Sequence, residues 1–137
     1  MGRILAIDYG EKNIGLAITD ELQIIASPLD VLKNDDKFLE NLKKLKDYYK
    51  FDTIVIGYPE TPTPRKSQEI IKEFGEKIKN FLSIEIIYYN EAFTTVYARN
   101  FLSSLGQKEK KIKKIVDKIA AQKILEDYLK NKPQKGV

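Results

Sequence analysis

Uninterrupted apolar runs at three places along the chain predict the strands of a buried sheet. The first run occupies residues 4–7, and the other two lie in the expected strands at residues 53–57 and 85–89, the last of which ends in Asn90 and Glu91. Strands that are covered on both faces carry such runs because neither face meets water. Residues 14–19 are expected to pair back on the first strand as a hairpin, and residues 23–32 to form a further strand. Pro28 suits the edge of a sheet because proline cannot donate a hydrogen bond to a neighbouring strand.

Hydrophobic residues also recur at helical spacing, between and after these runs. Helices are therefore expected at residues 38–49, 70–81, 94–105 and 111–129. The polar residues 34–36 can cap the first helix, because short acceptor side chains meet the free amides of a first turn. Thr94 or Thr95 can cap the third helix in the same way, and Gly106 can end it.

The order of these elements is a meander of strands followed by alternating helices and strands. A strand, a helix and a parallel strand in succession are joined by a right-handed crossover. We therefore expect an α/β protein with a mixed sheet, the first strand at its centre and helices on both faces. The length of 137 residues suits one domain, which we expect to span residues 1–137.

The composition excludes several kinds of catalysis. The chain has no Cys and no His, which removes disulfides, thiolate chemistry, imidazole bases and His-ligated metals. Any catalysis must then use carboxylates, lysines, hydroxyls or a metal held by oxygen ligands. The net charge of +4 favours an anionic partner such as nucleic acid. No stretch approaches the length of a membrane span and no signal-peptide pattern is present, so we expect a soluble, cytoplasmic protein.

Three acidic residues stand where acids are costly. Asp8 ends the first buried strand and Glu91 follows the last one, so both are expected at the sheet edge where such folds bind ligands. Asp117 interrupts the apolar stripe of the last helix beside the small residues Ala120 and Ala121, which would let that helix pack closely on the sheet. The alternatives are structural: Asp8 can simply begin a turn, and Asp117 can lie on an exposed helix start with lysines beside it.

Convergence of these acids is best explained by divalent metal binding. Close carboxylates raise each other's pKa unless a cation neutralises them, and hard oxygen ligands select Mg²⁺ or Mn²⁺. Two such ions could activate a water and stabilise the leaving oxygen of a phosphodiester. The flanking phosphates could be held by basic residues in the first turn, in a proline-rich loop and before the last helix: Lys12, Arg65, Lys66, Lys108, Lys110, Lys111 and Lys114.

Five segments in order along the chain resemble the YqgF/RuvX family. They are RILAIDYG at residues 3–10, IGLA at 14–17, IVIGYP at 54–59, NEAFTT at 90–95 and DKIAAQKILEDYL at 117–129. The resemblance implies an RNase H-like fold close to RuvC-type resolvases, with a five-stranded sheet in the order 3-2-1-4-5. It also implies a nuclease of the bacterial cytoplasm, linked to maturation of the 5′ end of pre-16S rRNA. Asp8, Glu91 and Asp117 match the acidic residues of the family's motifs.

The chain departs from the family pattern at two places. The family commonly has Asp-Glu-Arg where this chain has Asn90, Glu91 and Ala92. The loop after Pro59 carries Thr-Pro-Thr-Pro in place of a Met-Asp-Gly-like segment. These departures concern substrate contacts and catalytic strength, whereas the three acids themselves are present.

The leading hypothesis is a metal-dependent endonuclease acting on structured RNA, with a ribosomal precursor particle as a possible partner. One alternative is a Holliday junction resolvase acting on branched DNA, which would require a homodimer; the sequence leaves monomer and homodimer open. Another is a non-catalytic, RNA-binding ribosome-assembly factor. The first hairpin also resembles the phosphate-binding hairpin of actin-like ATPases, but those folds need two such domains and this chain has room for one.

Overall fold

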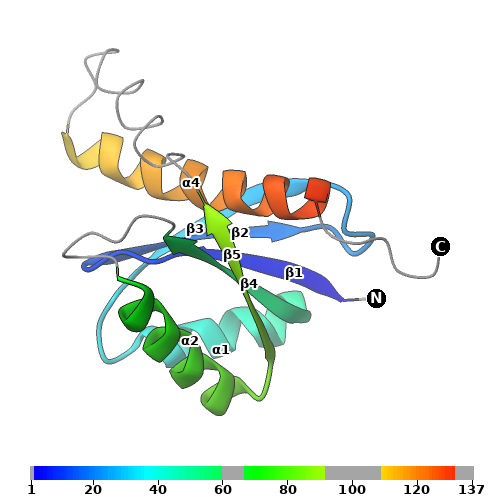
Figure 1. Ribbon diagram of the computed structural model, residues 1–137, viewed down its shortest axis with the longest axis horizontal. Coiled ribbons are helices and arrows are strands. Elements are labelled where there is room, and N and C mark those ends of the chain that lie inside the picture. Colours follow the sequence, from blue (N-terminus) through cyan, green and yellow to red (C-terminus); the bar gives the residue numbers. More distant parts are fainter. Residues whose placement is uncertain (1, 60–66, 92–108, 132–137) are drawn as a thin grey trace.

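The computed structural model describes residues 2–59, 67–91 and 109–131, which form one sheet with helices on both of its faces (Figure 1). The strands are β1 (Arg3–Asp8), β2 (Asn13–Thr19), β3 (Ala26–Lys33), β4 (Phe51–Pro59) and β5 (Glu85–Glu91). The helices are α1 (Phe38–Tyr49), α2 (Gln68–Leu82) and α4 (Glu109–Asn131). The helix expected at residues 94–105 and the proline-rich loop at 60–66 lie outside the described residues.

The strand order is β3-β2-β1-β4-β5, which confirms the predicted order with the first strand at the centre. β1 is antiparallel to β2 and parallel to β4, and β4 is parallel to β5. Because β1, β4 and β5 run in the same direction, their carboxyl ends lie along one edge of the sheet. We call this edge the carboxyl edge.

The side chains of β1 alternate between two hydrophobic cores. Leu5 and Ile7 are fully buried in the core beneath α1 and α2. Ile4 and Ala6 lie in a second core beneath α4, where the small Ala121 lets the helix approach the sheet. Figure 1 shows α1 and α2 on one face of the sheet and α4 lying across the other face. The alternation follows from the strand's two-residue period, because successive side chains point to opposite faces.

The predicted start of β3 and the predicted cap of α1 are wrong, whereas α1 itself spans the expected residues 38–49. β3 begins at Ala26 and not at Gln23, since the carboxylate of Asp20 accepts hydrogen bonds from the amides of Ile24 and Ile25, each at 2.8 Å. These bonds hold residues 20–25 in a turn. At α1, the N-cap position is Lys37, which makes no side-chain cap. The carboxylate of Asp35 instead accepts a hydrogen bond from the amide of Lys37 at 3.0 Å, and Lys37 is the residue before the helix begins.

Candidate functional site

Asp8 ends β1 at the carboxyl edge and is only 3% exposed. It continues the alternation of Ile4 and Ala6, so its side chain belongs to the face that α4 covers. Across the ladder, Asp8 pairs with Gly15 of β2. Asp8 also precedes the turn into β2, as the structural alternative expected, but its carboxylate is buried and therefore needs partners inside the protein.

At Gly15 the backbone of α4 comes into direct contact with the sheet. A Cβ atom at Gly15 would overlap the carbonyl oxygen of Asp117 and would lie 2.6 Å from its carbonyl carbon. No side chain larger than hydrogen fits there unless the helix moves. A glycine in mid-strand often marks a close approach of another segment, and here the approaching group is the backbone of Asp117.

Asp117 lies on the buried side of α4 and is 8% exposed. Its neighbours along that side, Ala120, Ala121 and Ile124, are almost fully buried against the sheet. The prediction that Asp117 is pressed toward the sheet is confirmed, and its placement on an exposed helix start is wrong. Because Gly15 contacts Asp117 and also pairs with Asp8, the two carboxylate residues are neighbours across a single glycine.

Glu91 is the last residue of β5 and pairs with Pro59 at the end of β4. In the register of the sheet, Ile7 pairs with Ile56, and Ile56 pairs with Tyr88. Asp8 is one residue past Ile7 and Glu91 is three residues past Tyr88, so both lie at the carboxyl edge. The side chain of Glu91 lies outside the described residues, as does any cluster that depends on it. Among the described side chains, no three carboxylates are gathered closely enough to hold a metal ion.

The chemistry of the two buried acids suits a hard cation. Burying two carboxylates in one region of the fold is unfavourable unless hydrogen bonds, a proton or a cation offset the loss of water around them. Oxygen donors without nitrogen or sulfur are the ligands that Mg²⁺ and Mn²⁺ prefer. The site therefore fits divalent metal through Asp8 and Asp117, with the backbone of Glu91 at the same edge.

The predicted phosphate-binding residues are only partly placed by the structure. Lys12 is exposed in the β1–β2 turn at the carboxyl edge, and its carbonyl accepts from the Asn34 amide at 2.9 Å. The backbones of Lys110, Lys111 and Lys114 belong to the first turns of α4, shortly before Asp117. Their side chains, and all of Arg65, Lys66 and Lys108, lie outside the described residues.

A hollow lined by Tyr9, the residue after Asp8, was not expected from the sequence. It measures about 300 Å³ and lies on the α1 and α2 side, lined by Tyr9, Phe38 and Phe74 with Asp35 and Asp36 among the polar groups. The rings of Tyr9 and Phe74 meet edge to face at 4.8 Å. The only sequence signal for it was an aromatic residue directly after Asp8.

Comparison with known proteins agrees with this geometry. The RuvX profile, described as Holliday junction resolvase, matches residues 2–131. The chain belongs to the RuvX family. A Clostridium botulinum relative named "Putative pre-16S rRNA nuclease" is 40% identical over 131 residues, which cover 93% of this chain and 96% of the relative. A relative from a Sulfurihydrogenibium species with the same name is 39% identical, over 94% of this chain and 90% of its own.

Solved structures with similar folds include Holliday junction resolvases. The fowlpox virus resolvase aligns with a TM-score of 0.54 at 18% identity, covering 93% of this chain and 98% of its own. Thermus thermophilus RuvC, solved with a Holliday junction substrate, gives 0.51 at 12% identity, covering 95% and 96%. These likenesses establish the RNase H-like fold. The chain belongs to the RuvX family and its relatives are named as nucleases, which supports a nuclease function. No helix within the described ranges is both long and apolar enough to cross a membrane.

Proposed function

We propose that this protein is a metal-dependent endonuclease that cleaves precursor 16S rRNA near its 5′ end, in the bacterial cytoplasm. The observation that carries the proposal is that Asp8 pairs with Gly15 at the carboxyl edge and that Asp117 packs against the same glycine. Two acids from residues 8 and 117, more than a hundred positions apart in the chain, are buried together where open α/β sheets bind ligands. Relatives that share about 40% of the sequence carry the name of a pre-16S rRNA nuclease.

In this proposal Asp8, Glu91 and Asp117 hold two Mg²⁺ or Mn²⁺ ions. Bound ions of this kind supply a nucleophilic water and stabilise the charge on the leaving oxygen of a phosphodiester. The protein's own contribution is rigidity. Asp8 ends a buried strand and Asp117 is fixed by its backbone contact with Gly15, so neither carboxylate must be reorganised when substrate binds.

The nucleic acid would follow the positive charges that border this edge. Lys12 is exposed beside it, and α4 begins with lysines at 110, 111 and 114 on the turns that precede Asp117. Arg65, Lys66 and Lys108 are proposed to extend the same surface. Contacts of this kind hold the phosphate backbone without reading sequence, so the choice of cleavage position would come from RNA structure.

Branched DNA is the second candidate substrate. Two structural neighbours with TM-scores of 0.51 and 0.55 were solved with Holliday junctions, one of them RuvC and the other the fowlpox virus resolvase. A resolvase must cut two strands, which requires two copies of the site. A protein that binds RNA without cutting it is the third candidate.

Cleavage assays on a precursor rRNA fragment and on a four-way DNA junction distinguish these possibilities. Each substrate is tested with Mg²⁺, Mn²⁺ or a chelator, using the wild type, Asp8→Asn and, as a control, Asp47→Asn, an exposed carboxylate paired with Lys43 at 3.1 Å. We expect metal-dependent cleavage of the RNA, its loss in Asp8→Asn and no change in Asp47→Asn.

The fold should survive the Asp8→Asn substitution. Removing one of two neighbouring buried charges relieves repulsion in the metal-free protein, so its melting temperature should stay the same or rise. A protein that unfolds on this substitution would show that Asp8 is structural. Binding of RNA with no cleavage under any condition would favour the assembly factor, and preferential cleavage of the junction would favour the resolvase.

A further inference from the structure

The turn between β2 and β3 exposes three large aliphatic side chains to solvent. Leu22, Ile24 and Ile25 are 65%, 67% and 63% exposed. The other large hydrophobic residues exposed within the described ranges, Tyr48 and Phe81, belong to α1 and α2 on the other side of the sheet. Three large aliphatic side chains exposed within four residues of one turn are typical of an interaction surface.

This turn is held in one conformation by its polar residues. Asp20 accepts hydrogen bonds from the amides of both Ile24 and Ile25 at 2.8 Å. Gln23 takes a left-handed backbone conformation with φ of 58°, and its side-chain amide donates to the carbonyl of Gly2 at 2.7 Å. The aliphatic side chains are therefore presented from a preorganised turn, which lowers the entropy lost when a partner binds.

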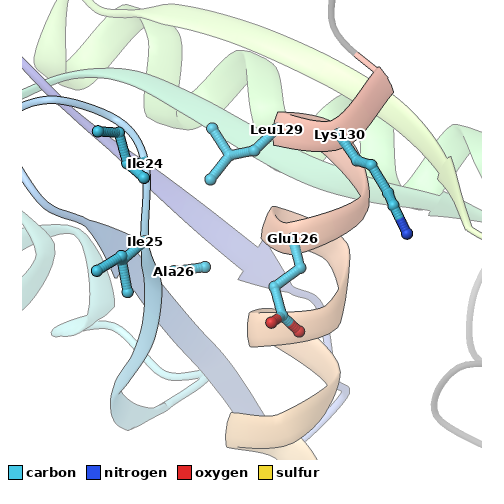
Figure 2. A pocket seen from close by; sticks show the side chains of 6 residues that line it. All are labelled: Ile24, Ile25, Ala26, Glu126, Leu129 and Lys130. Atoms are coloured by element: carbon cyan, nitrogen blue, oxygen red, sulfur yellow. The ribbon is translucent and has the colours of Figure 1, made fainter.

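A groove lies directly beside the exposed side chains. It measures about 440 Å³ and runs between residues 24–26 on one wall and Glu126, Leu129 and Lys130 of α4 on the other. Figure 2 shows Leu129 reaching from the helix toward Ile24, while Ile25 points away from the helix. Gln122 ties the two walls together by donating to the Ala26 carbonyl at 3.3 Å.

This surface lies at the end of the molecule opposite the carboxyl edge. The turn meets Gly2, just before β1 begins, whereas Asp8 ends that strand. Along α4, Leu129 follows Asp117 by twelve residues, or about 18 Å at the rise of an α-helix. A partner bound here would leave the proposed nuclease site accessible.

We propose that this surface binds the same surface of a second copy of this chain and forms a two-fold symmetric dimer. In a two-fold contact the same patch meets itself, so each projecting group needs a matching hollow on the same surface. The turn supplies projecting aliphatic side chains and the groove beside it supplies the hollow.

The charges on the groove wall also suit a second copy. Glu126 and Lys130 are one helical turn apart on α4, and both line the groove. When two such helices meet in antiparallel orientation, Glu126 lies opposite the partner's Lys130, and the reverse pair follows by symmetry. Although each chain carries a net charge of +4, the contact surface is balanced and self-association is not opposed locally.

Sedimentation velocity of the full chain, from about 1 μM to about 1 mM, tests the proposal. We expect the wild type to shift from monomer to dimer across this range. Ile24→Glu should weaken the dimer at least about a hundredfold, because it places two unpaired charges in an apolar contact. Ile24 is exposed in the monomer, so thermal unfolding of this variant should match the wild type. Tyr48→Glu, at a position 77% exposed on α1, is the matched control and should dimerise normally.

Charge reversal tests the orientation. Glu126→Lys alone and Lys130→Glu alone should each weaken the dimer, and the double reversal should restore it. A wild type that stays monomeric at all concentrations overturns the proposal, as does an Ile24→Glu variant that dimerises like the wild type. Failure of the double reversal to restore association would overturn the antiparallel pairing. None of these results depends on cleavage, so the dimer and the nuclease can fail separately.

Discussion

The contact between Gly15 and Asp117 makes a quantitative prediction for Gly15→Ala. The added Cβ would lie 2.6 Å from the Asp117 carbonyl carbon, whereas ordinary van der Waals contact begins at 3.4 Å. The obstacle is helix backbone and cannot rotate aside. The segment of α4 at Asp117 must therefore retreat by at least about 0.8 Å, the difference between these two distances, because the carbonyl oxygen lies closer still.

Two opposing effects set the stability of this variant. Overpacking of this kind costs about 1–3 kcal/mol, and alanine in place of glycine recovers about 0.4–1 kcal/mol by restricting the unfolded chain. The net loss should be about 1–2 kcal/mol, equivalent to a melting temperature lower by roughly 5 °C in a chain of this size. Thermal unfolding followed by circular dichroism measures it.

Cleavage should fall by more than the loss of folded protein explains. A displacement of about 1 Å at a reacting group can cost about a hundredfold in rate. Metal-dependent cleavage of the precursor fragment, measured well below the melting temperature, should fall by roughly that factor.

Gly75→Ala is the matched control, because its Cβ would meet the ring of Tyr88, 2.9 Å from Cε1, on the other face of the sheet. It should lose stability and keep its cleavage rate. If Gly15→Ala cleaves at the wild-type rate, the reasoning that this glycine positions Asp117 is refuted.

Two smaller predictions test local structure. Ser67 caps α2 by accepting from the Ile70 amide at 3.1 Å, so Ser67→Ala should cost about 1 kcal/mol in unfolding free energy and Ser67→Asp should retain most of it. Hydrogen bonds from the amides of Ile25 and Ile24 lower the pKa of Asp20 below its ordinary value of 3.8. The turn is therefore stabilised while Asp20 is ionised and loses this stabilisation as the pH falls through the lowered pKa. The protection of the Ile24 and Ile25 amides against hydrogen exchange, taken relative to the intrinsic rate at each pH, should fall in that range, and Asp20→Asn should remove this pH dependence.

The sequence alone determined the sheet and its order. The apolar runs at 4–7 and 54–56 can be recognised from neighbouring residues alone, because strands buried on both faces need apolar residues at every position. Crossover connections then leave few ways to arrange the strands, and the family motifs select one of them. The position of Asp8 at a strand end follows from the same pattern.

Only the tertiary structure decided how the acids meet. An aspartate on a helix with Lys113 and Lys114 nearby in sequence is equally compatible with solvent, and the choice depends on which side of α4 packs on the sheet. That side was decided by Gly15, whose missing side chain admits the backbone of Asp117. Such a contact joins residues about a hundred positions apart, and no local pattern contains it.

The turn between β2 and β3 is a second place where the sequence pattern did not decide the structure. Ile24 and Ile25 have the β-branched side chains of strand residues, and the sequence placed them in a strand. In the folded protein the amides of both residues donate to the Asp20 carboxylate instead of to a neighbouring strand, and both side chains are exposed to solvent. Hydrophobic pattern determines which residues can be buried, whereas competition for backbone hydrogen bonds and the packing of distant elements decide which ones are.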